Sequence, residues 1–462
     1  MLTLDQMRRK LKSWGVKNYS KVDRSGLEKM MRENEPDSKE PETTITAPPV
    51  VVSTKLSNNV ILGDGTGQEI ILRLLDKSYV PYIKKQLGVD FAIKVERDHE
   101  NPLNVPYWTG LPEWKLVDQQ WPIINLKIQG DRERELISGW DWTEPTQINP
   151  KTKSLWYPHR PVLKKEGQYW TTDEPVVPKY PIYVISKGRW EKRLTSDSLI
   201  KMGVKHKLVI EGQEREKYIE HGADPDSLLI LPDEICNMGQ GSIPVRNFIW
   251  KHSTNRGYKR HWCLDDNIDG FFRFHNNTRT PVYSGVVFSV IEDYVDRFKN
   301  VYLSGLNYFS FCPDISKRRV LCQKNTRIYS CILIQNDCEH RWRGRYNEDT
   351  DLSLRVLKDG HPTMLFNLFL CNKQTTMSCK GGNTDSIYQG DGLQKKLDSL
   401  IEQHPDCVRG TVKFKKVHHQ VNYKPWAGNE AICEDPEKYT GLSVNEYGMK
   451  LMMGNGNVVA NE

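Results

Sequence analysis

The stretch HWCLDDN (261–267) decides the fold, because a short apolar run ends abruptly in Asp265, Asp266 and Asn267. It follows a helical stretch at 245–254, and three earlier apolar runs are each followed by a polar or helical stretch. These runs are PIYVIS (181–186), HKLVI (206–210) and SLLIL (227–231), and the later ones are VYLSGLNYFSF (301–311), RIYSCILIQ (327–335) and TMLFNLFL (363–370). The alternation predicts a β-α-β series, and hence one α/β domain over residues 176–426.

Polar side chains follow the first of these predicted strands. Ligands of an open parallel sheet bind at the carboxyl ends of its strands, because loops and helix N-termini converge there. The first strand ends in Ser186, Lys187, Gly188 and Arg189. The glycine allows close backbone approach, and the two cations can meet the phosphates or base of a nucleotide. A solvated turn is the alternative interpretation.

The fourth strand ends in Asp265, Asp266 and Asn267, which form a cluster of oxygen ligands. Such a cluster suits a hard divalent cation, which can bridge a diphosphate and neutralise charge on a departing nucleotide. A turn or a helix cap is the alternative, because Asp and Asn favour both. The place of this run in the series favours the cation.

An acidic cluster in RYNEDTDLSLR (345–355) opens a predicted amphipathic helix. Leu352 and Val356 are expected to face inward, which puts Glu348, Asp349 and Asp351 in the first turn. Carboxylates there interact favourably with the helix dipole, and this alone would explain them. They would equally place a general base beside the anomeric carbon of a sugar.

The order and spacing of these segments resemble a known family. SKGR (186–189), then Val245-Arg246-Asn247 on the helix before LDDN (264–267), then NED (347–349) at a helix start are similar to the GT-A glycosyltransferases. The similarity is greatest to the TET-associated glycosyltransferases of bacteriophages and their kinetoplastid base J relatives, and it spans residues 179–426. It implies a Rossmann-like GT-A fold and transfer of a sugar, generally from a uridine diphosphate sugar, to the hydroxyl of an oxidised or hydroxymethylated pyrimidine in DNA.

The resemblance also implies roles for single residues. The nucleotide pocket would be lined by Ser186, Lys187, Gly188 and Arg189, and the base or diphosphate would be supported by Arg246, Asn247 and Asp265. Asp265 and Asp266 would hold Mn²⁺ or Mg²⁺. Asp349 would be the general base, and Glu348 would assist it.

One departure from the family concerns the third place of the metal motif, which is usually a carboxylate and is Asn267 here. The metal would then bind more weakly or through water. His418 or His419 in VHHQVN (417–422) would complete the site, and a surface pair of histidines is the alternative. The loop SCKGGNTDSIY (378–388) is either a lid over the donor or a plain surface connection.

The chain outside this domain divides into four predicted parts. Residues 1–34 have apolar residues at helical spacing on both sides of a break and resemble a SAP-like module that faces nucleic acid, with a docking helical hairpin as the alternative. Residues 35–55, acidic and rich in Pro and Thr, predict a flexible tether. The Trp-rich part at 56–175 opens with NVILGDGTGQEIILRLL (59–75), expected to form a strand, a Gly-rich turn and an amphipathic helix, and has no assigned function. Residues 427–462 are expected to form a C-terminal tail.

The composition fits a soluble protein of several folding units, since the 462 residues are 37% hydrophobic and 27% charged. A net charge of +7 permits an anionic partner without proving one. All 10 Cys lie at or after Cys236 without a CxxC pair, which favours reduced thiols in the cytoplasm, the host cytoplasm for a viral protein. Without an apolar run of membrane length, no membrane partner is expected.

The sequence therefore predicts a glycosyltransferase that moves a hexose from a uridine diphosphate donor to a hydroxymethylpyrimidine in DNA. Glucose is the expected sugar and 5-hydroxymethylcytosine the expected acceptor. A GT-A transferase that acts on a protein or glycan is the rival enzyme. A non-catalytic DNA-binding protein with a degenerate transferase domain is the third possibility, which Asn267 keeps open.

Overall fold

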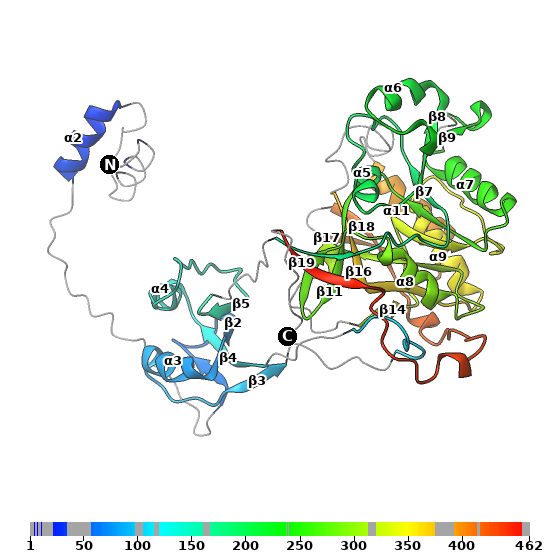
Figure 1. Cartoon of the computed structure of the whole chain (residues 1–462). Helices are drawn as coiled ribbons and strands as arrows, with labels where there is room; N and C mark the ends of the chain where they lie inside the picture. Colours follow the sequence, from blue (N-terminus) through cyan, green and yellow to red (C-terminus); the bar gives the residue numbers. More distant parts are fainter. Residues whose placement is uncertain are drawn as a thin grey trace. The chain divides into compact units, whose positions relative to one another are not determined.

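The computed structural model of the chain describes most of its residues. The described residues are 4, 7, 11, 22–34, 57–97, 105–114, 120–159, 167–236, 238, 240–312, 320–374, 392–413 and 416–454. The chain divides into two compact units (Figure 1). The first comprises Met1–Lys94 and Pro122–His159, and the second comprises Val95–Trp121 and Arg160–Glu462. The predicted loop at 378–388 lies outside the described residues.

Near the N-terminus, helix α2 (Arg24–Asn34) begins after Asp23, whose carboxylate accepts a hydrogen bond from the backbone N–H of Gly26 at 2.9 Å. Met7, Leu11 and Leu27 are buried together. This small helical cluster agrees with the helical spacing in the sequence. Its SAP-like character stays a prediction.

The rest of the first unit is a sheet with two helices. Its strands are β1 (Asn59–Ile61), β2 (Gln68–Leu74), β4 (Gln120–Ile128) and β5 (Ser154–Tyr157), in the order β1-β4-β2-β5. Its helices are α3 (Val80–Leu87) and α4 (Asp131–Ser138), and β3 (Lys94–Arg97) lies where the chain passes to the second unit.

The expected helix after the Gly-rich turn is wrong, because residues 68–74 form strand β2. Ile70, Leu72 and Leu74 are buried and alternate with more exposed residues, which is the two-residue period of a strand. β2 is a strand because it pairs with both β4 and β5. A short apolar run in the sequence fits a strand or a helix and does not reveal these pairing partners. The glycines form the turn between β1 and β2.

The second unit is built on a ten-stranded mixed sheet. Its order is β12-β11-β16-β13-β15-β10-β7-β8-β9, with β14 beside β16. The strands are β7 (Ile182–Ile185), β8 (Lys207–Glu211), β9 (Leu228–Leu231), β10 (Arg260–Leu264), β11 (Ile268–His275), β12 (Thr278–Pro281), β13 (Leu303–Tyr308), β14 (Cys322–Lys324), β15 (Cys331–Gln335) and β16 (Thr363–Lys373). The strands predicted from the apolar runs are confirmed, and the mixed α/β fold is as expected.

The four strands predicted first, β7 to β10, run parallel in the order β9-β8-β7-β10. The chain moves outward from β7 to β8 and β9 and then returns to the other side of β7 with β10. The strand order therefore reverses between β7 and β10, and ligands of open α/β sheets bind beside such a reversal.

Helices cover both faces of this sheet. Trp262 and Leu264 of β10 pack with α5 (Leu194–Lys201) and α8 (Val286–Val295), whereas Cys263 packs with α7 (Ile243–Asn255) and α9 (Glu348–Lys358). The alternation follows from the two-residue period of a strand. Leu352 and Val356 of α9 face the sheet, as predicted.

The outer side of α9 packs on further elements of the second unit. Leu354 and Leu357 contact a cluster that includes Leu400 and Trp426. The elements there are α11 (Gly392–Gln403) and the hairpin of β17 (Val408–Lys413) and β18 (Lys416–Val421). Helix α9 thus lies between the sheet and α11.

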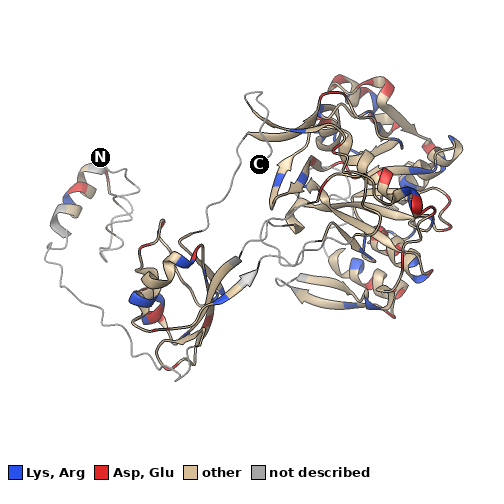
Figure 2. Ribbon diagram, turned by 60° about the horizontal axis from the view of Figure 1, so that its bottom comes forward, with Lys and Arg blue, Asp and Glu red and all other residues tan. Residues whose placement is uncertain are grey.

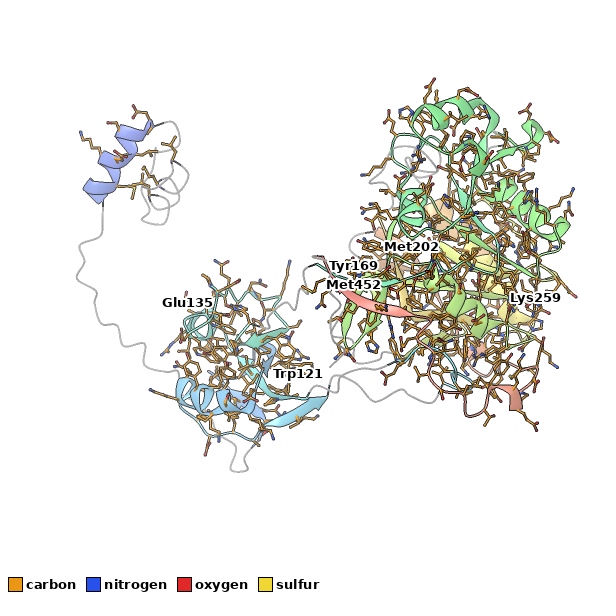
Figure 3. The ribbon with its side chains drawn as sticks, viewed as in Figure 1. Trp121, Glu135, Tyr169, Met202, Lys259 and Met452 are labelled. Carbon is orange, nitrogen blue, oxygen red and sulfur yellow. The ribbon has the colours of Figure 1, made fainter. Side chains whose placement is uncertain are left out.

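The second unit extends beyond the predicted domain at both ends. Strand β6 (Gln168–Thr172) pairs with β19 (Met449–Met453), and Tyr169 lies opposite Met452 (Figure 3). Trp170 and Met449 belong to the core of this unit. The residues expected to form a C-terminal tail therefore include a strand, because a partner that precedes it by almost 300 residues is invisible in its local pattern.

Short helices complete the two units: α6 (Arg215–Glu220) and the 3-10 helices Lys77–Tyr79, Gly212–Glu214, Pro225–Ser227, Asp233–Ile235, Phe309–Phe311, Lys424–Trp426 and Glu437–Tyr439. Basic and acidic residues are interspersed along the described helices (Figure 2). Within the described part of the chain, every helix is too short or too polar to cross a membrane.

Glu292 of α8 is a buried carboxylate that ties α8 to β10 and to the segment before β7. It accepts hydrogen bonds from Trp262 Nε1 at 2.8 Å and from the backbone N–H groups of Lys179 at 2.7 Å and Tyr180 at 3.3 Å. Burial disfavours its charged form and raises its pKa to about 7, above the ordinary value of 4.5. Between these two values the folded protein binds a proton that the unfolded chain lacks.

We therefore expect Glu292 to make the protein less stable as pH rises from 4.5 to 7. Its share of the free energy of unfolding falls by roughly 3 kcal/mol over this range, at about 1.4 kcal/mol for each pKa unit. Urea denaturation at several pH values should show this slope, and Glu292→Gln, which is neutral throughout, should lose it. Glu216→Gln on exposed α6 is the control. An unchanged slope in Glu292→Gln would contradict the assignment.

Candidate active site at the carboxyl ends of β7 and β10

Asp265 lies directly after β10 and is the centre of the site. Its Oδ2 accepts hydrogen bonds from Lys373 Nζ and Ser330 Oγ, both at 2.7 Å. Its Oδ1 faces Arg246 Nη2 at 2.9 Å. The backbone is fixed as well, because Thr195 Oγ1 donates to the Asp265 carbonyl at 2.7 Å. Four elements distant in sequence thus meet on one residue.

The charges around Asp265 keep it ionised. Burial by itself would raise the pKa of this carboxyl, but Lys373 and Arg246 oppose that effect and hold the pKa below its ordinary value. The side chain is 23% exposed, so part of it remains accessible to solvent.

Arg246 of α7 links Asp265 to the helix that carries the predicted base. Its Nε lies 3.8 Å from Glu348 Oε1, and the same oxygen accepts a hydrogen bond from Ser242 Oγ at 2.9 Å. The guanidinium also stacks over the ring of Trp342 at 4.6 Å. Glu348 is thereby held at the start of α9, beside the end of β10.

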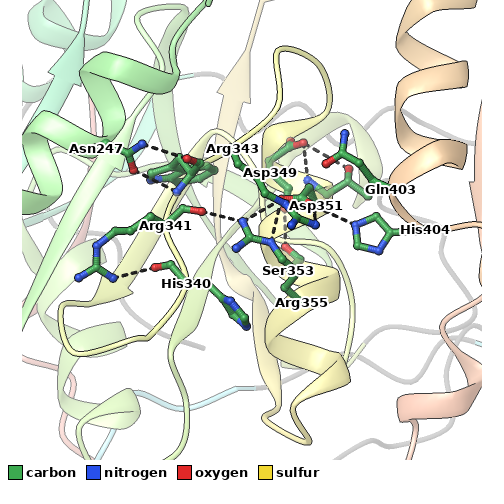
Figure 4. A network of polar contacts seen from close by, with 12 residues as sticks. Asn247, His340, Arg341, Arg343, Asp349, Asp351, Ser353, Arg355, Gln403 and His404 are labelled. Carbon is green, nitrogen blue, oxygen red and sulfur yellow. Dashed lines mark hydrogen bonds and ion pairs between the residues drawn. The ribbon is translucent and has the colours of Figure 1, made fainter. Parts of the chain in front are cut away.

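Asn247 has a different position from its neighbour. Its Nδ2 donates to the Trp342 carbonyl at 2.9 Å, and its Oδ1 accepts from the Trp342 N–H at 3.0 Å (Figure 4). The amide therefore clamps the backbone that carries the Trp342 ring. In the described structure it positions Arg246 indirectly and makes no contact with the carboxylates at the end of β10.

Asp266 and Asn267 form the turn between β10 and β11. Asp266 Oδ2 lies 3.4 Å from Arg189 Nε, and burial raises the pKa of this carboxyl to about 6. Asn267 Nδ2 donates to the Gln374 carbonyl at 3.4 Å. Its Oδ1 is buried and has no hydrogen-bond partner among the described residues. A buried acceptor without a partner costs free energy, and a bound ligand or ion could supply the missing partner.

The loop after β7 is held by the ends of β8 and α6. Ser186 Oγ lies 2.7 Å from the Tyr218 hydroxyl, and Lys187 Nζ donates to Glu211 Oε1 at 2.7 Å. The N–H of Gly188 donates to both carboxylate oxygens of Glu214 at 3.1 Å. Gly188 has φ of 66°, a left-handed conformation that glycine adopts without strain. The predicted nucleotide loop is thus ordered, with Arg189 turned to Asp266.

Asp349 lies in the first turn of α9. Asn347 precedes the helix in the left-handed conformation, with φ of 54°, and its Nδ2 donates to the Lys396 carbonyl at 2.8 Å. Asp349 Oδ1 accepts from the Thr350 N–H at 2.7 Å. Burial would raise the pKa of Asp349, but Arg327 and Lys396 outweigh it and lower the pKa. Asp349 is therefore a carboxylate at neutral pH.

The two candidate histidines lie on strand β18, where His419 lies near Arg327 and Asp349. His418 is exposed, and His419 Nε2 lies 3.5 Å from Arg327 Nη1. Burial and Arg327 lower the pKa of His419 to about 4. Neither ring forms a ligand group with Asp265 and Asp266 in the described structure, where the one group of metal-ligating type is His404, Asp406 and Cys407.

The chemistry of the turn fits a divalent cation in part. Among the described residues Asn267 Oδ1 has no hydrogen-bond partner, and the Asp266 carboxylate pairs with Arg189 at 3.4 Å, so both offer oxygen atoms. Asp265 offers an oxygen as well, but both of its oxygens already contact Lys373, Ser330 or Arg246. A cation at Asp265 would have to share the carboxylate with Lys373.

Three residues of the site were not found by sequence analysis. Lys373 and Ser330 contact Asp265, and Arg327 lies close enough to Asp349 to lower its pKa. Lys373 ends β16, so the reasoning that found Asp265 at the end of an apolar run applies to it equally. Ser330 and Arg327 lie in a loop, and only the tertiary contacts identify them.

Asp351 has a structural place distinct from that of Asp349 (Figure 4). It is fully buried and contacts Arg343 Nη2 at 3.0 Å, Arg355 Nη2 at 2.8 Å and His404 Nε2 at 2.9 Å. The pair between Asp351 and Arg355 joins residues four apart on α9, which lie on the same side of the helix. This network joins α9 to α11 and to the loop before α9.

Asp351→Asn should lower the free energy of unfolding by about 3 kcal/mol, because it leaves the largely buried guanidinium of Arg355 beside a neutral amide. Asp359→Asn at the end of the same helix is the control, since Asp359 is 46% exposed and pairs with His340. Its loss should stay below about 1 kcal/mol. Equal losses in urea denaturation would show that the Asp351 network does not stabilise the fold.

Comparison with known families agrees with this geometry. Residues 180–382 match the model of the TET-Associated Glycosyltransferase family. Comparison with curated proteins finds no match. The matched segment is a little under half of the chain and contains β7, β10, α7 and the start of α9, where the site lies. The resemblance of this part of the chain to the TET-associated glycosyltransferases is therefore confirmed.

Proposed function

We propose that the second unit transfers a hexose, glucose, from a uridine diphosphate sugar to the hydroxyl of a hydroxymethylpyrimidine in DNA, with 5-hydroxymethylcytosine as the acceptor. One observation carries the proposal. Within the segment that matches the glycosyltransferase family, the ends of β7 and β10 and the first turn of α9 are joined by ion pairs at the strand reversal. That is where an α/β sheet binds a nucleotide.

The donor would lie across the ends of β7 and β10. Ser186, Lys187, Gly188 and Arg189 supply a backbone turn and two cations for the nucleotide. Mn²⁺ or Mg²⁺ would be held by Asp266, the Asn267 amide oxygen and Asp265, and would supply charge for the departing diphosphate. A ligand role for His418 or His419 stays a prediction, since neither ring lies with these carboxylates.

The acceptor hydroxyl would lie beside the first turn of α9. Asp349 is ionised at neutral pH because Arg327 and Lys396 lower its pKa, so it can accept the hydroxyl proton as the new bond forms. A low pKa also makes it a weaker base, so its orientation matters more than its basicity. Glu348, held by Arg246 and Ser242, would fix the position of the helix start.

DNA as the acceptor rests on the family resemblance and on the N-terminal residues 1–34, which we propose to be a SAP-like module that contacts DNA phosphates. The paired charges of the site favour an enzyme over a degenerate scaffold. Lost function removes the need to keep Arg246 and Lys373 in contact with Asp265 and Glu348, because burying such charges is costly.

Replacement of Asp349 should slow transfer strongly and spare donor binding. We expect Asp349→Asn to reduce turnover by about 100- to 10,000-fold, because it removes the proton acceptor. The assay uses uridine diphosphate glucose and DNA that contains 5-hydroxymethylcytosine, followed by mass analysis of nucleosides, and calorimetry measures donor affinity. Asp359→Asn at the far end of α9 is the matched control. Near-normal turnover in Asp349→Asn would refute the assignment, and inactivity of Glu348→Gln alone would move the base one residue earlier.

Donor binding should require a divalent cation, because the carboxylates at the end of β10 would otherwise repel the diphosphate. Calorimetry with uridine diphosphate should show affinity falling about 100-fold, close to 3 kcal/mol, on chelation and in Asp266→Asn. Asp197→Asn is the control, because the Asp197 side chain of α5 is 47% exposed. If affinity survives both chelation and Asp266→Asn, the cation assignment is wrong.

A further inference from the structure

Lys373 occupies the position beside Asp265 that a divalent cation would need. Its Nζ donates to Asp265 Oδ2 and to Ser330 Oγ, each at 2.7 Å, and lies 5.7 Å from the centre of the Tyr308 ring. The side chain is 18% exposed and ends β16, at the edge of the site. Its charge therefore opposes a second cation at the same oxygen.

Protein cations already contact the carboxylates at the end of β10. Arg246 and Lys373 pair with Asp265, and Arg189 pairs with Asp266. A divalent cation that binds alone therefore adds positive charge beside these groups. A cation that arrives with a diphosphate adds less, because the phosphates bring negative charge.

Of the two cations on Asp265, Lys373 has the more exposed side chain, at 18%. Arg246 is 5% exposed and is fixed by Asp265, Glu348 and the ring of Trp342. Lys373 carries a compact charge on a flexible four-carbon stem, and its ammonium can exchange one oxygen partner for another. The nearest new partners for that ammonium would be the oxygens of a bound diphosphate.

We propose that Lys373 is a donor-binding residue that neutralises Asp265 in the empty site and turns its ammonium to the diphosphate when the donor binds. This inference rests on the proposed function, because it needs a nucleotide diphosphate at the ends of β7 and β10. Lys373 then makes cation and donor bind together: it weakens binding of the cation alone and strengthens binding of the diphosphate.

The test is to replace Lys373 with Met and measure two affinities that should change in opposite directions. Without donor, Mn²⁺ should bind the Lys373→Met protein about tenfold more tightly, because the competing charge is gone. At saturating Mn²⁺, uridine diphosphate should bind about tenfold more weakly, because one phosphate partner is lost. Calorimetry measures both constants without any transfer reaction. Lys324→Met, on an exposed lysine of neighbouring β14, is the matched control.

Further variants keep the test decisive. Lys373→Gln retains an N–H donor for Asp265 and replaces Lys373→Met if the Lys373→Met protein unfolds. Lys373→Arg retains the positive charge and should keep Mn²⁺ binding weak. A loss of both affinities would mean that Lys373 only supports the fold, and unchanged affinities would mean that it takes no part; either result overturns the inference alone. If the wild-type protein binds no uridine diphosphate with any divalent cation, the proposed function fails and this inference with it.

Discussion

The pairing of Asp265 with Arg246 and Lys373 is the interaction on which the second unit depends at its functional edge. It joins the end of β10, the buried face of α7 and the end of β16, and Ser330 adds the segment before β15. A carboxylate this close to the core is tolerated only if it is paired, because an unpaired buried charge is costly. Positions far apart in the chain are therefore constrained together.

The same interaction explains how the site is divided. Asp265 is fully engaged by protein cations, which leaves Asp266 and Asn267 in the turn as the less satisfied oxygen donors. Their environments differ accordingly, since burial raises the pKa of Asp266 to about 6 whereas Lys373 and Arg246 hold that of Asp265 low. Adjacent carboxylates thus have different chemistry, one as a structural centre and one at the edge of the proposed donor site.

Sequence predicted the half of the fold whose pattern is local. Parallel strands that are buried on both faces appear as apolar runs in the sequence. Strands β7 to β10 could therefore be predicted, together with the helical stretch between β9 and β10. The identity of β2, the pairing of β6 with β19 and the contact of Lys373 with Asp265 depend on partners far along the chain. Local pattern does not encode such partners, which is why these features emerge only from the structure.

Helix α9 shows how fold and site share one element. Two residues span about 200° around a helix, so Asp349 and Asp351 point to nearly opposite sides. Asp351 faces His404, which directly follows α11, and anchors the helix through buried contacts, while Asp349 lies near the guanidinium of Arg327. Because the anchor lies within one turn of Asp349, it fixes the direction in which that carboxylate points. A proton acceptor with a lowered pKa gains little from basicity, and a rigid position beside the acceptor hydroxyl is then its principal means of assisting transfer.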